Sequence, residues 1–343
     1  MTPRFAVLPG DLVHRTLAGA EKSVVSLVED AYRLHGEGRT VNPPSYFLRF
    51  PDRPSARIIA LPASLGGQAP VDGLKWISSF PDNVRSGLPR ASAVLILNDP
   101  ETGYPFACLE SSIISAVRTA ASAALAADVL NRDRERPTRV GFVGCGLIAR
   151  YVHTYLSAGV GWRFEEIGLH DLSADHARQF ADYLDRSGAD CPVVVHETAE
   201  DLVRSCDLVV FATVAATPHV TDPAWFAHHP QVLHLSLRDL SQEVVLASTN
   251  VVDDVEHVLK AGTSVHLAEQ RVGHRDFLHG TLHDVLTGAV DPPRDRPLVF
   301  SPFGLGVLDL AVGLHVYREV ERAGDLPVVD GFFHELRRYG AAT

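Results

Sequence analysis

A glycine-rich turn carries the clearest chemical signal in the sequence. The segment Gly144-x-Gly146-x-x-Ala149 follows an apolar run over 139–143 and begins a helical pattern over 147–158. In such a turn the first glycine allows a tight bend, the second lets a pyrophosphate approach the backbone, and a small third residue lets the helix pack on the sheet. The segment therefore predicts a dinucleotide site, although the same turn also occurs without a ligand.

The predicted dinucleotide site extends beyond the glycines. The backbone N–H groups of Leu147 and Ile148 begin the helix, where free N–H groups and the helix dipole favour phosphate. Asp171 follows Ala149 by 22 residues at the end of the next expected strand, which is the spacing of an acid that binds ribose hydroxyls. Because an acid there would repel a 2′-phosphate, it predicts NAD rather than NADP. Thr213 follows the strand C-D-L-V-V-F-A and is either a cofactor contact or an ordinary strand-end threonine.

Three charged residues stand in apolar surroundings and need partners. Lys75 lies in a strand-like run, so it requires either a pocket or a sheet edge. Arg118 lies among alanines and serines, where a guanidinium is either a bidentate carboxylate receptor or part of a structural ion pair. Asp239 follows the strand-like V-L-H-L-S-L, at the carboxyl end where ligands of open α/β sheets gather.

Other kinds of catalytic site find little support in the sequence. His279 and His283 are four residues apart, but there is no H-E-x-x-H pattern and Gly280 weakens a helix there, so no metal site is predicted. The remaining histidines are expected at the surface. There is no G-x-S-x-G element for a serine nucleophile, and the four cysteines form no C-x-x-C pair.

Length and charge limit the class of protein. The chain has 343 residues, 46% of them hydrophobic and 21% charged, which is the composition of a globular protein of about two domains. Its net charge of −11 argues against nucleic-acid and anionic-membrane partners, but not against an anionic small molecule. Neither a signal peptide nor a run of about 20 uncharged apolar residues is present. We therefore expect a cytoplasmic protein.

Two parts of the chain differ in the expected order of strands and helices. After a helix over 20–35, five strand-like runs between 45 and 110 follow one another without helices, which predicts an antiparallel or mixed sheet. A long helix is expected over 111–130, and the charged stretch 131–138 is a plausible domain boundary. Beyond it, strands alternate with helices up to a last helix over 306–324, which predicts a doubly wound parallel sheet.

Six motifs occur in one order along nearly the whole chain: G-L-K-W-I-S-S-F-P-D-N (73–83), T-G-Y-P-F-A (102–107), R-T-A-A (118–121), G-C-G (144–146), L-R-D (237–239) and S-P-F-G-L-G-V-L-D-L (301–310). With these motifs the chain resembles the ornithine cyclodeaminase/μ-crystallin family. The resemblance implies a Rossmann-type NAD-binding domain over 131–305. This α/β domain would be inserted in an α+β substrate-binding and dimerisation domain over 1–130 and 306–343. It also implies a homodimer built on the N-terminal sheet.

Several wordings resemble one branch of that family, the N-(2-amino-2-carboxyethyl)-L-glutamate dehydrogenases: R-I-I-A-L-P-A, P-R-A-S-A-V-L-I-L-N-D, E-T-G-Y-P-F-A-C-L-E and H-L-S-L-R-D-L. The branch makes L-2,3-diaminopropionate for siderophores and peptide antibiotics. The resemblance implies NAD-dependent cleavage of the glutamate derivative to 2-oxoglutarate and L-2,3-diaminopropionate, by hydride transfer from the glutamate Cα and hydrolysis of the imine. Ornithine or lysine cyclodeamination, ketimine reduction, alanine dehydrogenation and a non-catalytic crystallin-like binding role stay open as alternatives.

The resemblance also implies roles for single residues. Lys75 would contact and polarise the substrate, and Arg118 would hold a substrate carboxylate with the cofactor nearby. Asp239 would be the catalytic acid–base group, with its pKa tuned by burial so that it acts as a base near neutral pH. Ser301 would contact the cofactor.

Two positions depart from the family pattern. Arg238 stands in L-R-D where the family usually has G-G-D or G-S-D, and it is either a receptor for an extra carboxylate or a solvent-facing residue. Ile59 stands where ornithine cyclodeaminases carry a glutamate that meets the substrate amine, and this loss disfavours ornithine. Arg49 and Arg57 are each either a surface residue or a carboxylate receptor, and Arg57, at the start of the same strand, is the better candidate.

Overall fold

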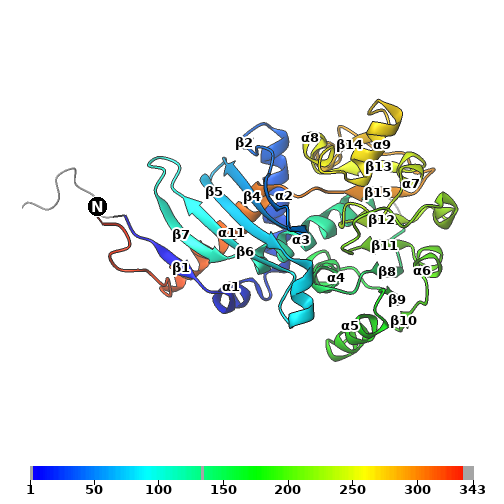
Figure 1. Cartoon of the computed structure of the whole chain (residues 1–343), viewed down its shortest axis with the longest axis horizontal. Helices are drawn as coiled ribbons and strands as arrows, with labels where there is room; N and C mark the ends of the chain where they lie inside the picture. Colours follow the sequence, from blue (N-terminus) through cyan, green and yellow to red (C-terminus); the bar gives the residue numbers. More distant parts are fainter. Residues whose placement is uncertain (1–2, 133–134, 335–343) are drawn as a thin grey trace, which may run out of the picture. The chain divides into compact units, whose positions relative to one another are not determined.

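The structure is a computed structural model that describes residues 3–132 and 135–334. The chain forms two compact units (Figure 1). Unit 1 comprises Met1–Arg118 and Leu305–Thr343, and unit 2 comprises Thr119–Gly304, so unit 2 is inserted in the sequence of unit 1. The division falls inside helix α3 (Ser112–Leu130). Within the charged stretch 131–138, residues 133–134 lie outside the described part.

A mixed sheet forms the centre of unit 1. Its strands follow the order β1-β7-β6-β5-β4-β2, with β3 also paired to β4. Their bounds are β1 (Ala6–Leu8), β2 (Thr40–Val41), β3 (Tyr46–Phe50), β4 (Arg53–Leu65), β5 (Val71–Ser79), β6 (Ala91–Asn98) and β7 (Pro105–Glu110). Only the β1–β7 pair is parallel among these described pairs. The five predicted strand-like runs and the mixed sheet are therefore confirmed.

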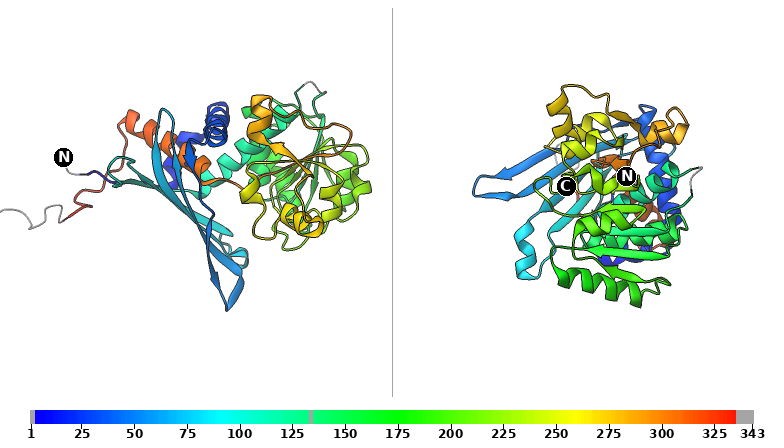
Figure 2. Two further views of the ribbon diagram at one scale, coloured as in Figure 1. Left: turned by 90° about the horizontal axis from the view of Figure 1, so that it is seen from above. Right: turned by 90° about the vertical axis from the view of Figure 1, so that its right-hand side faces the viewer.

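Helices cover one face of this sheet. They are α1 (Gly10–Leu17), α2 (Glu21–Gly36), the first part of α3 and α11 (Gly306–Ala323), with a 3₁₀ turn η1 at Pro81–Ser86. The left view of Figure 2 shows α2 and α11 on the same side of the strands. Close approach of α11 depends on glycine, because a Cβ on Gly313 would lie 2.1 Å from the Leu95 side chain and one on Gly73 would lie 2.6 Å from Leu310.

Helix α3 is largely apolar and carries two charged side chains, Arg118 and Asp128. Its length and composition would suit a membrane span, but 72% of the apolar window is buried inside the protein. Burial of that extent is typical of a core helix, since a spanning helix would present this surface to lipid. Helix α3 is therefore a core helix.

Unit 2 is a doubly wound α/β unit. Its strands are all parallel and follow the order β10-β9-β8-β11-β12-β15-β13-β14. Their bounds are β8 (Arg139–Val143), β9 (Glu166–His170), β10 (Val193–Val195), β11 (Leu208–Phe211), β12 (Gln231–His234), β13 (Thr249–Val252), β14 (Leu278–Thr281) and β15 (Leu298–Ser301). From β8 the chain passes first to one side and then, at β11, to the other, which is the topological switch point of a Rossmann fold. The predicted fold class is confirmed.

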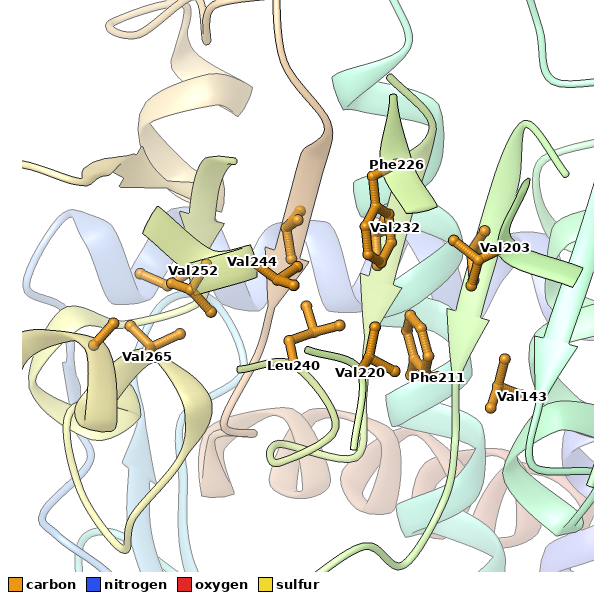
Figure 3. Close-up of a cluster of buried hydrophobic side chains, with 14 of the residues drawn as sticks. Val143, Val203, Phe211, Val220, Phe226, Val232, Leu240, Val244, Val252 and Val265 are labelled. Atoms are coloured by element: carbon orange, nitrogen blue, oxygen red, sulfur yellow. The ribbon is translucent and has the colours of Figure 1, made fainter. Parts of the chain in front are cut away.

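Helices lie along both faces of the unit 2 sheet (Figure 2). They are α4 (Leu147–Thr154), which continues into a π-turn η2 (Tyr155–Gly159), α5 (Ala174–Arg186), α6 (Ala199–Ser205), α7 (Gln242–Leu246), α8 (Val255–Val258), α9 (Ser264–Val272) and α10 (Leu282–Thr287), with a 3₁₀ turn η3 at Pro223–Phe226. A buried apolar cluster joins strands to helices, and Figure 3 shows Val143, Phe211 and Val232 within it.

Some sequence predictions of local structure were wrong. The strand expected over 232–237 ends at His234, and the chain then turns through Leu237 with φ +74°. His234 and His257, expected at the surface, are 0% and 6% exposed.

Candidate active site

The glycine turn lies at the carboxyl end of β8. Gly144 has φ +92°, and a Cβ there would lie 2.7 Å from the carbonyl oxygen of Ala212, so only glycine fits. At Gly146 a Cβ would meet no atom within 4 Å. The first glycine is therefore required by the protein's own chain, whereas the second leaves open space in front of the backbone.

Helix α4 begins at this open space without a side-chain cap. Its N-cap residue, Gly146, has no side chain that could cap the first N–H groups. Helices α5 to α10, in contrast, each begin at a capping Ser, Thr or Asp. The first N–H groups, at Leu147 and Ile148, are those that a phosphate would accept from. A cavity of about 270 Å³ borders the turn and is lined by Cys145, Gly146, Leu147, Arg150, His176, Gln179, Phe180 and Tyr183. The donor set and the open space fit a pyrophosphate.

Asp171 lies directly after β9, beside the glycine turn. Its Oδ2 accepts the N–H of Cys145 at 2.9 Å, and its Oδ1 accepts the N–H of Ser173 at 2.9 Å. The side chain is 18% exposed, and Nδ1 of His176 lies 3.6 Å from Oδ1. The carboxylate is thus held at the turn by two backbone bonds while it keeps lone pairs for hydroxyl donors.

Asp239 follows β12 at the same carboxyl edge of the sheet. Its carboxylate is 0% exposed and is surrounded by donors. Oδ1 accepts from the hydroxyl of Thr213 and from Nε2 of His219, the latter at 3.0 Å. Oδ2 accepts from the hydroxyl of Ser236, and Nε2 of His234 lies 3.4 Å away. The hydroxyl of Thr213 therefore donates to Asp239 and not to solvent.

This surrounding corrects the expectation that Asp239 has a pKa near neutrality. Burial alone would raise the pKa of Asp239, but the surrounding side chains of His219, His234 and Ser236 together outweigh burial and hold the pKa well below its ordinary range. The group is consequently a fixed carboxylate anion at physiological pH. Its chemistry is that of an acceptor and a negative charge.

The loop that carries Asp239 is tied down by Arg238. The Arg238 guanidinium donates to the carbonyl oxygen of Gly262 at 3.0 Å and also to that of Ala261. The backbone of Leu237, which adopts a positive φ, accepts the N–H of Ser264 at 2.7 Å. Arg238 therefore neither faces solvent nor presents its whole guanidinium to a ligand, because these donors fix the loop.

Ser301 lies at the far end of the hydrogen-bonded group that contains Asp239 and His234. It is 2% exposed at the end of β15, and its Oγ lies 3.1 Å from Nδ1 of His234. Nε2 of His234 also meets the backbone N–H of Asp239 at 3.2 Å. Ser301, predicted as a cofactor contact, is thus linked to Asp239 through one buried imidazole.

Unit 1 holds a second charged group, built around Asp309. Nζ of Lys75 donates to Oδ2 of Asp309 at 2.7 Å, and Nε of Arg118 donates to Oδ1 at 3.3 Å. Ser115 lies 3.4 Å from the same Nζ. Lys75 is 2% exposed, Asp309 is 0% exposed and Arg118 is 12% exposed. One buried carboxylate therefore orients both predicted substrate cations.

Burial and a neighbouring cation make Lys75 unusually easy to deprotonate. Burial is the largest influence and lowers the pKa of Lys75, and the Arg118 charge lowers it further. Asp309 opposes both, and the result is a pKa of about 8 instead of 10.5. A lysine with such a pKa can change protonation state near physiological pH, which suits a group that polarises a substrate and exchanges a proton.

Arg57 lies on the same face of the sheet as Lys75. Directly opposed residues of antiparallel strands share a face, and Arg57 faces Ser79, which is four residues and roughly 13 Å from Lys75 along β5. Arg49 is opposite Arg57, and Arg90 donates to Oγ of Ser79 at 2.7 Å. The structure thus places Arg57 in a basic group at one end of the Lys75 face.

Sequence reasoning missed four residues of these groups: His219, His234, Ser236 and Asp309. The signal for Asp309 was available, because an acid inside the apolar G-V-L-D-L requires a buried partner. His219 and His234 gave no such signal among seventeen histidines.

The fold and the nucleotide turn define a protein built on a dinucleotide-binding Rossmann unit, and the relatives described next place it among the oxidoreductases. The chain belongs to the ornithine cyclodeaminase/mu-crystallin family, whose model matches residues 17–324.

Three relatives bear on the chemistry. An alanine dehydrogenase from Archaeoglobus fulgidus is 30% identical over 302 residues, covering 85% of this chain and 88% of the relative. An N-((2S)-2-amino-2-carboxyethyl)-L-glutamate dehydrogenase from Staphylococcus aureus is 28% identical over 308 residues, covering 87% and 90%. The solved structure of an archaeal alanine dehydrogenase dimer with bound NAD is 27% identical with a TM-score of 0.84, covering 96% of this chain and 100% of that one. The relatives are amino-acid dehydrogenases, and they differ in substrate.

Proposed function

We propose that the protein is an NAD-dependent dehydrogenase that cleaves N-(2-amino-2-carboxyethyl)-L-glutamate to 2-oxoglutarate and L-2,3-diaminopropionate, in siderophore or peptide-antibiotic biosynthesis. The observation that carries the substrate choice is the basic face of the unit 1 sheet. The substrate has three carboxylates and two amines, whereas L-ornithine has one carboxylate and two amines and L-alanine has one of each. A face that suits this substrate must therefore bind additional carboxylates.

The composition of that face supports the proposal. Lys75, Arg57 and Arg49 all lie on it, and the described strands β3 to β7 contribute no acidic side chain to it. Ile59, at the position where ornithine cyclodeaminases carry a glutamate, faces Ile77 on the same surface. Arginines opposite one another across β3 and β4 repel, so a bound carboxylate would stabilise them.

The nucleotide turn supports NAD as the cofactor. Gly146, Leu147 and Ile148 would hold the pyrophosphate, and Asp171 would accept from the adenosine ribose hydroxyls. The negative charge of Asp171 disfavours the 2′-phosphate of NADP. When bound, NAD supplies the hydride acceptor.

The chain's residues would then bind and orient the amino acid. Arg118 would receive the α-carboxylate through guanidinium donors other than the Nε–H that meets Asp309. Arg57 would receive a more distant carboxylate, roughly 13 Å from Lys75 along the sheet. Lys75 would polarise the reacting centre, held by Asp309. The secondary ammonium loses a proton, hydride leaves the glutamate Cα, and water adds to the resulting iminium carbon before the C–N bond breaks.

We also propose a homodimer formed through the opposite face of the unit 1 sheet. Tyr46, Trp76 and Val94 lie in one row across β3, β5 and β6 on that face and are 70%, 40% and 39% exposed. A row of exposed large apolar side chains is typical of an interface, and a related structure is a dimer. Trp76→Glu should convert the dimer to monomer in sedimentation equilibrium.

We also propose a cytoplasmic location. The four cysteines are unpaired, which is consistent with a reducing compartment.

A substrate comparison tests the proposed function. With the glutamate derivative and NAD, one 2-oxoglutarate should form per NADH, and L-alanine should give at most a slow reaction. Arg57→Gln should lower kcat/KM for the derivative by about 10- to 100-fold, because a charge-assisted carboxylate contact contributes about 1.5–3 kcal/mol. The same variant should leave the residual L-alanine rate unchanged. Faster turnover of L-alanine than of the derivative by the wild-type protein would contradict the substrate assignment.

A further inference from the structure

The Asp239 carboxylate has no evident capacity to take up a substrate proton. A carboxylate offers about four lone-pair directions. Thr213, His219 and Ser236 donate to three of them, and Nε2 of His234 lies 3.4 Å from the Oδ2 atom. The side chain is also 0% exposed, and its pKa is held below the ordinary range. The carboxylate is therefore enclosed, and a substrate nitrogen or a reacting water would reach it only by displacing one of the groups around it.

His219 is the reachable member of this group. Its side chain is 41% exposed, whereas those of Asp239 and His234 are 0% exposed. It stands on the loop that follows β11 and so lies at the same carboxyl edge of the unit 2 sheet as the glycine turn. Ligands of open α/β sheets bind at this edge.

The position of His219 is fixed by backbone as well as by the carboxylate. The N–H groups of His219 and Val220 both donate to the carbonyl oxygen of Asp239, at 3.0 and 2.9 Å. The N–H of Ser241 returns to the carbonyl oxygen of Val220 at 2.9 Å. The loop after β11 and the loop after β12 therefore hold the imidazole and the carboxylate together as one rigid pair.

We propose that His219 is the proton-transfer residue of this enzyme and that Asp239 is the buried carboxylate that orients it. This inference rests on the proposed oxidation of a secondary amine. Because an ionised carboxylate only accepts, Nε2 of His219 must carry the hydrogen that it shares with Oδ1 of Asp239. The other nitrogen, Nδ1, then has the lone pair that acts as the base.

The proton inventory closes with this residue. Nδ1 takes one proton from the secondary ammonium, which frees the nitrogen lone pair as hydride leaves the Cα for NAD. The carbon is oxidised by two electrons and NAD is reduced by two. The imidazolium is stabilised by Asp239 and returns its proton to the leaving amine when the C–N bond of the hydrated iminium breaks. Both protons of the added water leave its oxygen: one stays on the amine nitrogen and the other goes to solvent. The net products are 2-oxoglutarate, the diamine, NADH and one proton.

Removal and replacement of the imidazole test the proposal. His219→Ala should lower kcat by about 100-fold or more, the usual contribution of general acid–base catalysis, with NAD affinity unchanged. Added imidazole should restore part of that rate, since the position is open to solvent. His274→Gln is the matched control, because His274 also contacts an aspartate in unit 2, Asp276 at 3.4 Å, and is 52% exposed. Its rate should equal that of the wild type.

The outcomes separate this inference from the proposed function. If the wild-type protein oxidises L-alanine instead of the glutamate derivative, the proposed function fails, and His219→Ala is then measured with L-alanine. A His219→Ala rate within about threefold of wild type, or a loss that imidazole does not restore in a folded variant, overturns the role of His219. Histidine ¹⁵N NMR provides a readout without turnover: His219 should be the Nε2–H tautomer in wild type and should change in Asp239→Asn. An Nδ1–H tautomer would refute the proposal.

Discussion

Replacing Lys75 by methionine should show separately what the ammonium group contributes to catalysis and what its burial costs in the free energy of unfolding. The ammonium is 2% exposed, and Arg118 adds a second cation to the same Asp309 carboxylate. Burial and the Arg118 charge lower the pKa of Lys75 to about 8, from 10.5 in an unfolded chain. Lys75→Met has a similar apolar length and leaves the Asp309–Arg118 pair as a neutral unit. The variant should therefore be inactive without being less stable.

The size of the effect follows from the pKa of Lys75. Between about pH 8 and 10.5 the unfolded chain binds this proton more strongly than the folded protein does. The free energy of unfolding must then rise with pH through that window, because the unfolded state binds more protons there. At about 1.36 kcal/mol per pKa unit, Lys75 contributes a rise of about 2 kcal/mol between about pH 7 and 9.5. In Lys75→Met this contribution is absent.

Urea unfolding of both proteins at these two pH values measures the contribution. Trp76 is the tryptophan of unit 1, so a Trp76→Phe control assigns its fluorescence transition to that unit. Other alkaline groups titrate in both proteins alike, and the difference between their pH dependences isolates Lys75. If wild type and variant show the same change in unfolding free energy between the two pH values, Lys75 is not a buried ammonium with a lowered pKa.

Four further changes have defined outcomes. Asp309→Asn should destabilise unit 1 by about 3–5 kcal/mol in urea unfolding, because it leaves two buried cations without their anion; a loss below about 1 kcal/mol would argue against the buried triad. Gly144→Ala should lower the melting temperature, since its Cβ would lie 2.7 Å from a carbonyl oxygen at φ +92°. Gly146→Ala should keep the wild-type melting temperature but lose NAD affinity in calorimetry, because its Cβ enters open space; unchanged affinity would move the pyrophosphate elsewhere. Asp171→Ala should narrow the preference for NAD over NADP by about tenfold or more in kcat/KM, as removal of one repulsive charge predicts; an unchanged ratio would contradict the ribose role.

The dinucleotide turn could be predicted from the sequence because its chemistry is local. Gly144, Gly146 and Ala149 act within one strand–turn–helix unit, so their spacing carries the geometry. The alternation of strands and helices gave the parallel sheet for the same reason. The short strands β14 (L-H-G-T) and β15 (L-V-F-S) were missed because four residues are too few to show a strand period, and L-H-G-T is not apolar.

The charged groups depend on contacts that spacing does not encode. Lys75 and Asp309 are 234 residues apart and meet only once α11 lies on the sheet. Arg238 was expected at a ligand or in solvent, yet its partners are two carbonyl groups of a loop more than twenty residues away. His219 reaches Asp239 because two loops after neighbouring strands are joined by backbone bonds. Such loop conformations are set by tertiary structure and not by local sequence.

The most direct test of the function follows NADH absorbance after NAD is mixed with N-(2-amino-2-carboxyethyl)-L-glutamate, and separately with L-ornithine. Oxidative cleavage should give a stoichiometric rise in NADH with the first compound alone. Cyclodeamination regenerates NAD and leaves no net NADH, so a flat trace with the first compound, together with proline and ammonia from L-ornithine, would contradict the proposal. That result would also overturn the inference drawn from Ile59 and the basic face around Arg57.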